Sequence, residues 1–314
     1  MPDAPPRPMH PVYLPFTEDQ VRNHFAPVTS GGDRDRHLKH YRESIAHATG
    51  LVPLPDAGDP GKARRRARQI ERDERFWGAA TLLHAFHAED RTRALTVLLD
   101  RCLGDPAVAG FPTWRDALGG EQHLYLEANL PAPVSYRRWL AGHLDERVLT
   151  PTLLAEARGK GNRLEQATKV DAILLADTGF AVAFEAKVLS DASPTTTHDV
   201  LRNQIARTVD VLLDANPGLC PALARRDPAR TCLVLLTPDT FRRNPSSRLY
   251  GWLHREYKDN PAALGEHLPH RHGVDWDAVA GRLGWLTFED CAELLPGSCG
   301  WLPGVVGQGV APLG

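Results

Sequence analysis

The sequence predicts an α/β protein in which a mixed β-sheet is flanked by helices and preceded by a helical N-terminal region. Three observations predict this class. Residues 76–86 carry apolar side chains at helical spacing. Two β-prone runs, residues 168–176 and 180–189, are joined by a tight-turn signal. A further apolar run, residues 231–237, has the length and composition of a buried strand.

The first third of the chain is predicted to be mainly helical. Residues 1–60 are rich in Pro, Gly and His and include one expected helix, over residues 33–49. A helical pattern covers residues 62–103, and turn formers fill residues 104–120. We therefore expect the helical N-terminal region to span residues 1–118.

Residues 119–290 are predicted to form the mixed core of strands and helices. The elements expected in it are, in chain order, a helix or strand over 121–130, a helix over 135–148, strands over 168–176 and 180–189, a helix over 198–213, a strand over 231–237, helices over 248–258 and 275–283, and a strand over 284–288. The remaining residues, 291–314, end in a stretch rich in Gly and Pro and are expected to form a flexible tail.

The composition excludes several classes of protein. The formal net charge of the 314 residues is -2, so any nucleic-acid surface has to be local. Five cysteines without a CxxC pair indicate neither a disulfide framework nor a zinc site. No apolar run approaches the roughly 18 residues of a membrane span, and the N-terminus lacks a signal-peptide layout. We expect a cytoplasmic protein with no membrane partner.

The predicted hairpin of residues 168–189 carries a group of charged side chains. On its second strand, Glu185 and Lys187 point to the same face, because side chains alternate along a strand. A charged pair on an apolar strand is costly unless it is paired or binds something. The turn at residues 177–179 folds Asp171 of the first strand to the same end of the hairpin. Two carboxylates and a lysine are therefore expected to converge.

This combination suits hydrolysis of phosphodiester bonds. Carboxylate oxygens hold Mg²⁺, with Mn²⁺ as an expected substitute, and the metal keeps places for water and phosphate oxygens. The metal activates water and offsets the charge of the reacting phosphate. Lys187 can stabilise the same charge or orient the nucleophile.

The segments Val-Asp at 170–171 and Glu-Ala-Lys at 185–187 resemble the motif of the PD-(D/E)xK nuclease superfamily, whose members have the restriction-endonuclease-like fold. Val170 stands where the motif's name has proline. Downstream, Gln204 and Arg207 resemble the QxxR element of one branch of that superfamily, and their spacing places them on one helix face. The resemblance extends over about residues 121–288.

The resemblance assigns roles to these residues. It implies that Asp171 and Glu185 bind the metal together with the carbonyl oxygen of Ala186. Lys187 becomes the catalytic lysine, and Gln204 and Arg207 help to position the site or the DNA. A further acidic residue before the hairpin is common in the superfamily, and the candidates for it are Glu127 and Glu165.

A basic run precedes the hairpin by about a hundred residues, and its function is left open. Its arginines could follow a phosphate backbone; they are Arg64, Arg65, Arg66 and Arg68. The run could equally be a solvated helix face. In that case its charge partners are Glu71, Asp73 and Glu74.

A second ExK triplet in the chain matches the letters of the motif more closely but has the wrong geometry. Glu256 and Lys258 follow a literal Pro-Asp that ends at Asp239. The triplet lies in a predicted helix, where residues two apart point about 200° away from each other. The nearby histidines at 267, 270 and 272 have no partnered cysteine or acidic spacing and are expected to be a polar loop.

The sequence therefore predicts a Mg²⁺-dependent nuclease that cleaves DNA, with phage defence, restriction or repair as possible settings. A non-catalytic nucleic-acid-binding or assembly subunit with the same fold, and an RNA-cleaving nuclease, remain alternatives. The chain has no GxxxxGK[ST] loop, so a partner protein could supply ATPase activity or recognition. Cutting both strands with one site per chain would favour a homodimer.

Overall fold

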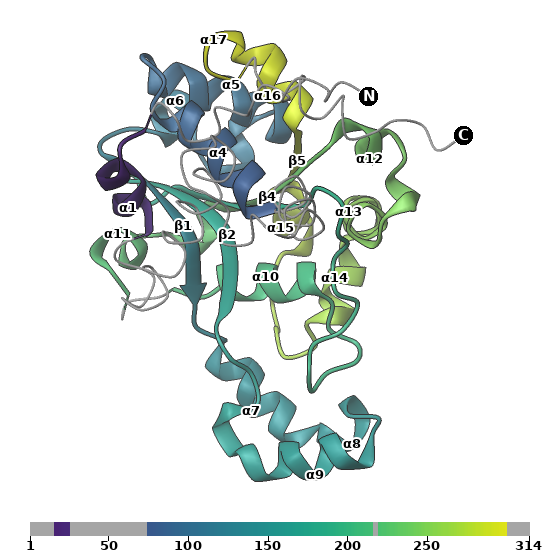
Figure 1. The fold of residues 1–314 in the computed structure, drawn as a ribbon. Coiled ribbons are helices and arrows are strands. Elements are labelled where there is room, and N and C mark those ends of the chain that lie inside the picture. The colour runs from purple at the N-terminus through teal and green to yellow at the C-terminus, as the bar shows by residue number, and fades with distance from the viewer. Residues whose placement is uncertain (1–15, 26–73, 216–218, 300–314) are drawn as a thin grey trace, which may run out of the picture.

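The computed structural model describes residues 16–25, 74–215 and 219–299. Within them a five-stranded sheet has the order β1-β2-β3-β4-β5 (Figure 1). The strands are β1 (Gln122–Leu130), β2 (Thr168–Ala176), β3 (Ala181–Ala186), β4 (Thr231–Thr237) and β5 (Leu283–Thr287). β2 is antiparallel to both of its neighbours, β1 and β3, whereas β3, β4 and β5 run parallel to one another. This is the α/β class with the mixed sheet that the sequence predicts.

One face of the sheet is covered by helices from both ends of the chain (Figure 1). They are α1 (Glu18–Phe25), α4 (Glu74–Phe86), α5 (Arg91–Leu103), α6 (Trp114–Ala117), α16 (Phe288–Leu294) and α17 (Pro296–Cys299). The short 3-10 turn η1 (Pro106–Ala109) lies between α5 and α6. Capping defines α5: Asp90 accepts a hydrogen bond from the N–H of Arg93 (3.0 Å), and Gly104 ends the helix at φ 71°.

The opposite face carries the helices that connect the parallel strands. They are α10 (Gln204–Leu212), α11 (Pro221–Ala224), α12 (Asp239–Arg243), α13 (Leu249–Asp259), α14 (Pro261–His267) and α15 (Trp276–Gly281), with 3-10 turns η3 (Pro228–Arg230) and η4 (Pro245–Ser247). β4 is buried on both faces: Val234 packs toward α4 and α5, and Leu233 packs toward α10 and α15. The fold is therefore a sheet between two helical layers.

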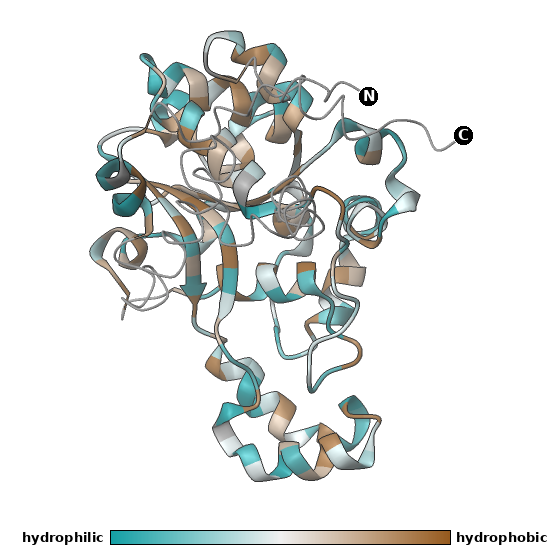
Figure 2. Ribbon diagram, in the orientation of Figure 1, coloured by the Kyte–Doolittle hydropathy of each residue, from teal (hydrophilic) through white to brown (hydrophobic). Residues whose placement is uncertain are grey.

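A small helical insertion separates β1 from β2. It consists of α7 (Val134–Gly142), α8 (Leu144–Arg147), α9 (Pro151–Lys160) and the turn η2 (Gly161–Arg163). It projects from the end of β1 and β2 away from the sheet (Figure 1) and has a small core of its own. Apolar and polar positions alternate along its short helices (Figure 2). Tyr136 connects it to the rest of the chain, because its hydroxyl donates to Asp199 Oδ2 (3.0 Å) and the Arg202 guanidinium stacks 3.4 Å from its ring centroid.

Most expected elements are confirmed, and two of the expected helices differ from the prediction. The strands over 168–176 and 231–237 have the predicted bounds, and residues 122–130 form a strand. The helix expected over 198–213 begins only at Gln204, because the Asn203 side chain caps it by accepting from the N–H of Ala206 (2.9 Å). The helix expected over 135–148 breaks at His143 into α7 and α8.

The chain ends contribute to the core more than the sequence predicts. Residues 291–299, expected within a flexible tail, form the end of α16 and all of α17, and Cys291 and Cys299 are fully buried. Helices α4 and α5, expected in a separate N-terminal region, share one hydrophobic core with the sheet. The expected helix over 33–49 and the basic run at 64–68 lie outside the described residues. Within the described part of the chain, no helix has the length and apolar character needed to cross a bilayer.

Candidate active site

The β2–β3 hairpin brings the first two acidic candidates together. Its turn is closed by the N–H of Ala176 donating to the carbonyl of Phe180 (3.0 Å), with Gly179 at φ 82°. The strand register pairs Ala172 with Phe184. One step further along the same register, Asp171 stands opposite Glu185. Both carboxylates therefore lie at the end of the hairpin remote from the turn.

The backbone pairing of β2 and β3 stops at this point. β2 continues to pair with β1, as in Val170 with Ala128, whereas the β2–β3 ladder ends at Ala172 and Phe184. The N–H of Ala186 donates instead to Oδ2 of Asp171 (2.8 Å). The Asp171 carboxylate thus replaces a backbone acceptor. Its other oxygen, Oδ1, accepts no hydrogen bond from the described residues.

Glu185, in β3, and Lys187, the residue directly after the end of β3, form a buried pair. Their relative exposures are 2% and 6%, and Nζ of Lys187 lies 2.8 Å from Oε1 of Glu185. The same Oε1 accepts from Nε2 of Gln204, at the start of α10, at 2.5 Å. Oε2 of Glu185 is buried and has no hydrogen-bond partner among the described residues. One oxygen of this carboxylate is therefore fully engaged, and the other is left for a ligand.

A third acidic residue reaches this group from a distant part of the chain. Glu74, the first residue of α4, places Oε2 3.7 Å from Nζ of Lys187. Its Oε1 accepts from the backbone N–H of Ser190 (3.1 Å) in the loop after β3. In the sequence, Glu74 stands out only as a charge partner of the basic run. The sequence signal for a role at this site is its position as an acidic residue in the helical stretch before the hairpin.

Burial and the closeness of the charged side chains shift the pKa values of Asp171 and Lys187. Burial, the neighbouring Glu185 and, more weakly, Glu127 raise the pKa of Asp171 well above its usual value, against the opposing effect of Lys187. Burial alone would lower the pKa of Lys187, but Glu185, Asp171 and Glu74 together raise it above its usual value. Lys187 is therefore a cation at neutral pH. Asp171, in contrast, is shifted toward its protonated form by its burial and by the neighbouring carboxylates.

The two candidates for the additional acid lie in different places. Glu127 is buried on β1 next to this group, pairs with Lys169 (3.1 Å between Oε2 and Nζ), and has φ 55°. It is the single non-glycine residue of the described chain with a positive φ, a strained conformation of the kind found at functional sites. Glu165 instead pairs with Nε of Arg207 (2.5 Å). Glu165 therefore connects the segment before β2 to α10 and is not part of the acidic group.

The Gln and Arg of α10 also have separate contacts. Gln204 holds Glu185, and it fixes the loop after β3 by accepting from the N–H of Ser193 (3.1 Å). Arg207 donates to the carbonyls at the entry to β2, Gln166 (3.3 Å) and Ala167 (3.2 Å). Gln204 contacts the group directly, whereas Arg207 positions the strand that carries Asp171.

The second ExK triplet does not assemble. Asp239, at the start of α12, pairs with Arg242 (3.1 Å) and Arg243 (2.7 Å). Lys258, near the end of α13, donates from Nζ to the carbonyl of Ala280 (3.0 Å). Glu256 accepts from the side chain of Asn260, the residue that caps the C-terminus of α13. Each of the three therefore has a separate structural role.

The nearby histidines are also part of structural networks. His270 contacts the buried Asp210 (3.0 Å), and His267 hydrogen bonds with the hydroxyl of Tyr257 (2.8 Å). Across the described part of the chain, no three Asp, Glu, His or Cys side chains form a ready metal-ligand cluster. A cation at the hairpin would therefore depend on two carboxylates supplemented by backbone and solvent oxygens.

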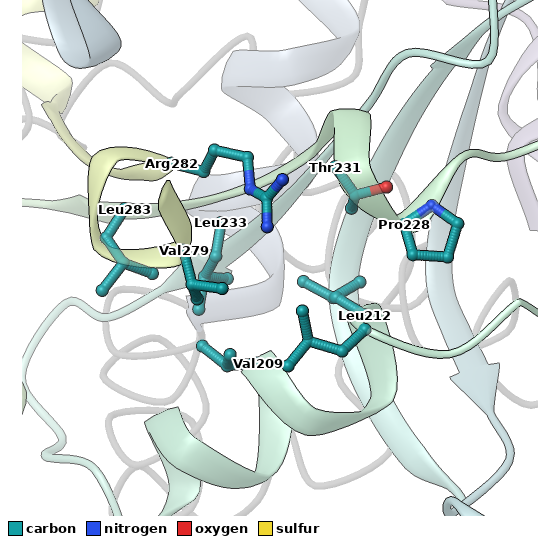
Figure 3. Close-up of a pocket in the computed structure, with 9 residues that line it drawn as sticks. Val209, Leu212, Pro228, Thr231, Leu233, Val279, Arg282 and Leu283 are labelled. Carbon is teal, nitrogen blue, oxygen red and sulfur yellow. The ribbon is translucent and has the colours of Figure 1, made fainter. Parts of the chain in front are cut away.

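A small hollow elsewhere in the fold has a different character (Figure 3). It lies between α10, β4 and α15 and is lined mainly by aliphatic side chains, with Thr231 and Arg282 as its polar members. In the parallel register Thr231 is level with Ala181, four residues before Glu185 on β3. The hollow has no carboxylate in its lining, and the hairpin remains the candidate site.

The donor set at the hairpin fits Mg²⁺. It consists of hard oxygens, and one oxygen of each carboxylate, Oδ1 of Asp171 and Oε2 of Glu185, is without a hydrogen bond from the described residues. Comparison of the chain with protein-family models, with curated proteins and with solved structures gives no match. The candidate function of the chain is therefore inferred from these residues.

Proposed function

We propose that this chain is a Mg²⁺-dependent nuclease that hydrolyses phosphodiester bonds of DNA on a restriction-endonuclease-like core. One observation carries the proposal. Two carboxylates, Asp171 and Glu185, face each other at the end of one hairpin, next to a buried lysine, and the pKa of Asp171 is raised. Like charges held together in this way are typical of sites that a cation completes.

The residues that would hold Mg²⁺ are Asp171, Glu185 and the carbonyl of Ala186. The β2–β3 ladder has already ended at Ala186, whose N–H bonds to Asp171. When bound, the metal would activate a water molecule and offset charge on the phosphate.

Lys187 supplies the positive charge of the site that comes from the protein itself. Its ammonium group is held by Glu185 (2.8 Å) and Glu74 (3.7 Å), so its position is defined before any substrate binds. A preorganised cation stabilises the charge that develops on the phosphate more than a mobile one does. Gln204 and Glu74 act as positioning residues in this proposal, because each contacts a proposed catalytic side chain.

A cleavage assay tests the proposal. Purified protein is incubated with supercoiled plasmid and with single-stranded RNA, each in Mg²⁺, in Mn²⁺ and in EDTA. We expect metal-dependent cutting of the DNA and a loss of at least about 100-fold in Lys187→Ala. The matched control is Glu256→Gln in the second ExK triplet, which should cut like the wild type. Equal activity of wild type and Lys187→Ala on every substrate and metal would refute the catalytic role.

Metal titration separates this proposal from a non-catalytic subunit with the same fold. Mn²⁺ binding is followed by calorimetry and by the rise in melting temperature, which grows with ligand concentration for a folded-state ligand. The wild type should bind Mn²⁺, and the double variant of Asp171→Asn and Glu185→Gln should not. A wild type that binds no Mn²⁺ would favour the non-catalytic alternative.

A further inference from the structure

One face of α13 combines two cations and an aromatic ring at the surface. The cations are Arg248, at the N-cap, and Arg255, within the helix, and the ring is that of Trp252. Trp252 is four residues after Arg248 and three residues before Arg255, so all three side chains lie on one side of the helix. Trp252 is 44% exposed, a large apolar area to leave in water. The opposite side of the helix, including Leu253 and Tyr257, is buried against the sheet.

The two arginines keep their positive charge available. Arg248 stacks 4.5 Å from the ring centroid of Phe241, and Arg255 donates to Oγ of Ser246 (3.0 Å). In the part of the chain that the structure describes, neither arginine forms an ion pair with a carboxylate. Asp259 bounds the face one turn beyond Arg255. The α13 face, meaning Arg248, Trp252 and Arg255, is therefore a cationic strip around one exposed indole.

The α13 face is tied directly to the candidate active site. Asp191 in the loop after β3 accepts from the backbone N–H groups of Leu249 (2.8 Å) and Tyr250 (3.2 Å) at the start of α13. Asp191 is four residues beyond Lys187, a chain length that spans at most about 14 Å. Ser190, its neighbour, is held by Glu74. The loop thus sets the distance between the α13 face and Lys187.

We propose that the α13 face binds a single-stranded segment of the nucleic-acid substrate, with Arg248 and Arg255 on phosphates and a base stacked on Trp252. Charge complementarity favours a phosphate backbone over an apolar partner. An exposed ring between two cations suits an unpaired base, because in a duplex the faces of the bases are already stacked. The choice of ligand rests on the proposed nuclease function, which it deepens by naming a substrate with unpaired bases.

A binding assay under conditions that prevent cleavage tests the proposed role of the α13 face. Fluorescence anisotropy is measured in EDTA with a labelled DNA strand of about 20 nucleotides, single-stranded or as a duplex. Trp252→Ala should weaken binding of the single strand about tenfold and leave the duplex unchanged, whereas Trp252→Phe should keep most of the affinity. Replacing both arginines by alanine should weaken both ligands and reduce the salt slope for the single strand by about 1.4, since each phosphate contact contributes about 0.7.

The matched control is Arg115→Ala on α6, an exposed arginine on a helix of the opposite face of the sheet, which should bind like the wild type. The proposal is overturned if Trp252→Ala binds the single strand like the wild type, or if it weakens duplex and single strand equally. It is also overturned if the variants change only self-association in sedimentation, which would make the α13 face a protein interface. Because the assay needs no cleavage, an inactive chain that still shows the Trp252 effect would refute the nuclease function alone.

Discussion

Glu74, the first residue of α4, lies with its Oε2 3.7 Å from Nζ of Lys187 at the end of β3. This contact joins the helical part of the chain before the hairpin to the proposed catalytic group. The other oxygen of Glu74 fixes Ser190, so one side chain holds both the lysine and the loop that follows it. Residues 119–290 alone therefore do not contain the complete group.

Removing only the charge of Glu74 should impair cleavage without unfolding the protein. In Glu74→Gln the amide oxygen can still accept from Ser190, but the side chain no longer holds the ammonium of Lys187 by charge. We expect single-turnover cleavage to fall about tenfold, a loss typical of a positioning group, with an unchanged melting temperature. Asp100→Asn, on the exposed side of α5, serves as the control. A Glu74→Gln rate equal to that of the wild type would leave Glu74 with a structural role only.

The stability of the metal-free protein should depend on the ionisation of Asp171. Because burial and Glu185 raise the pKa of Asp171, folding favours its protonated form. The resulting stabilisation is complete below the unfolded pKa of about 3.9 and is lost as the pH rises through the folded pKa.

In EDTA at about pH 8, Asp171→Asn should therefore melt at a higher temperature than the wild type, and the difference should vanish toward about pH 4. For a chain of this size each kcal/mol corresponds to about 2–4 °C. Thermal melts monitored by circular dichroism across this range provide the measurement. A variant that is less stable than the wild type throughout would show that the Asp171 charge is already compensated within the protein.

The buried network around Asp210 should be essential for stability and not for chemistry. Burial tends to raise the pKa of Asp210, but contacts with His270, Arg202 and Arg271 hold it below its usual value. Arg202 is fully buried, lies 2.6 Å from Asp210, and stacks on Tyr136 of the insertion. Asp210→Asn leaves the fully buried Arg202 without its carboxylate partner, and the loss of one member of a buried ion pair costs about 3–5 kcal/mol.

Urea unfolding of Asp210→Asn measures this loss, and the midpoint should fall with little change in slope. The exposed pair of Asp145 and Arg158 offers the comparison, since Asp145→Asn should leave the midpoint where it is. The stabilisation by Asp210 is present above its unfolded pKa and disappears as the pH falls through its lower folded pKa. The urea midpoints of Asp210→Asn and the wild type should therefore become equal only in acid. If the difference in midpoint persisted in strong acid, the Asp210 side chain would stabilise the fold by its packing and not by its charge.

The sequence by itself determined the hairpin and the residues gathered at its end. Side chains alternate along a strand, so Glu185 and Lys187 share a face whatever the rest of the chain does. A turn at residues 177–179 fixes the register, and the register sets Asp171 opposite Glu185. The second ExK triplet could be rejected in the same way, since the helix that carries it separates its members. These are local properties of a few neighbouring residues.

Only the tertiary structure decided what surrounds that hairpin. The pairing of Glu74 with Lys187, of Arg207 with Glu165, and of Asp191 with the start of α13 joins residues far apart in the chain. Likewise, residues 291–299 look like a tail in composition but pack against α4 and α5. Such contacts depend on which helix covers which face of the sheet. That choice is made by the packing of the whole core, and no pattern within a short segment contains it.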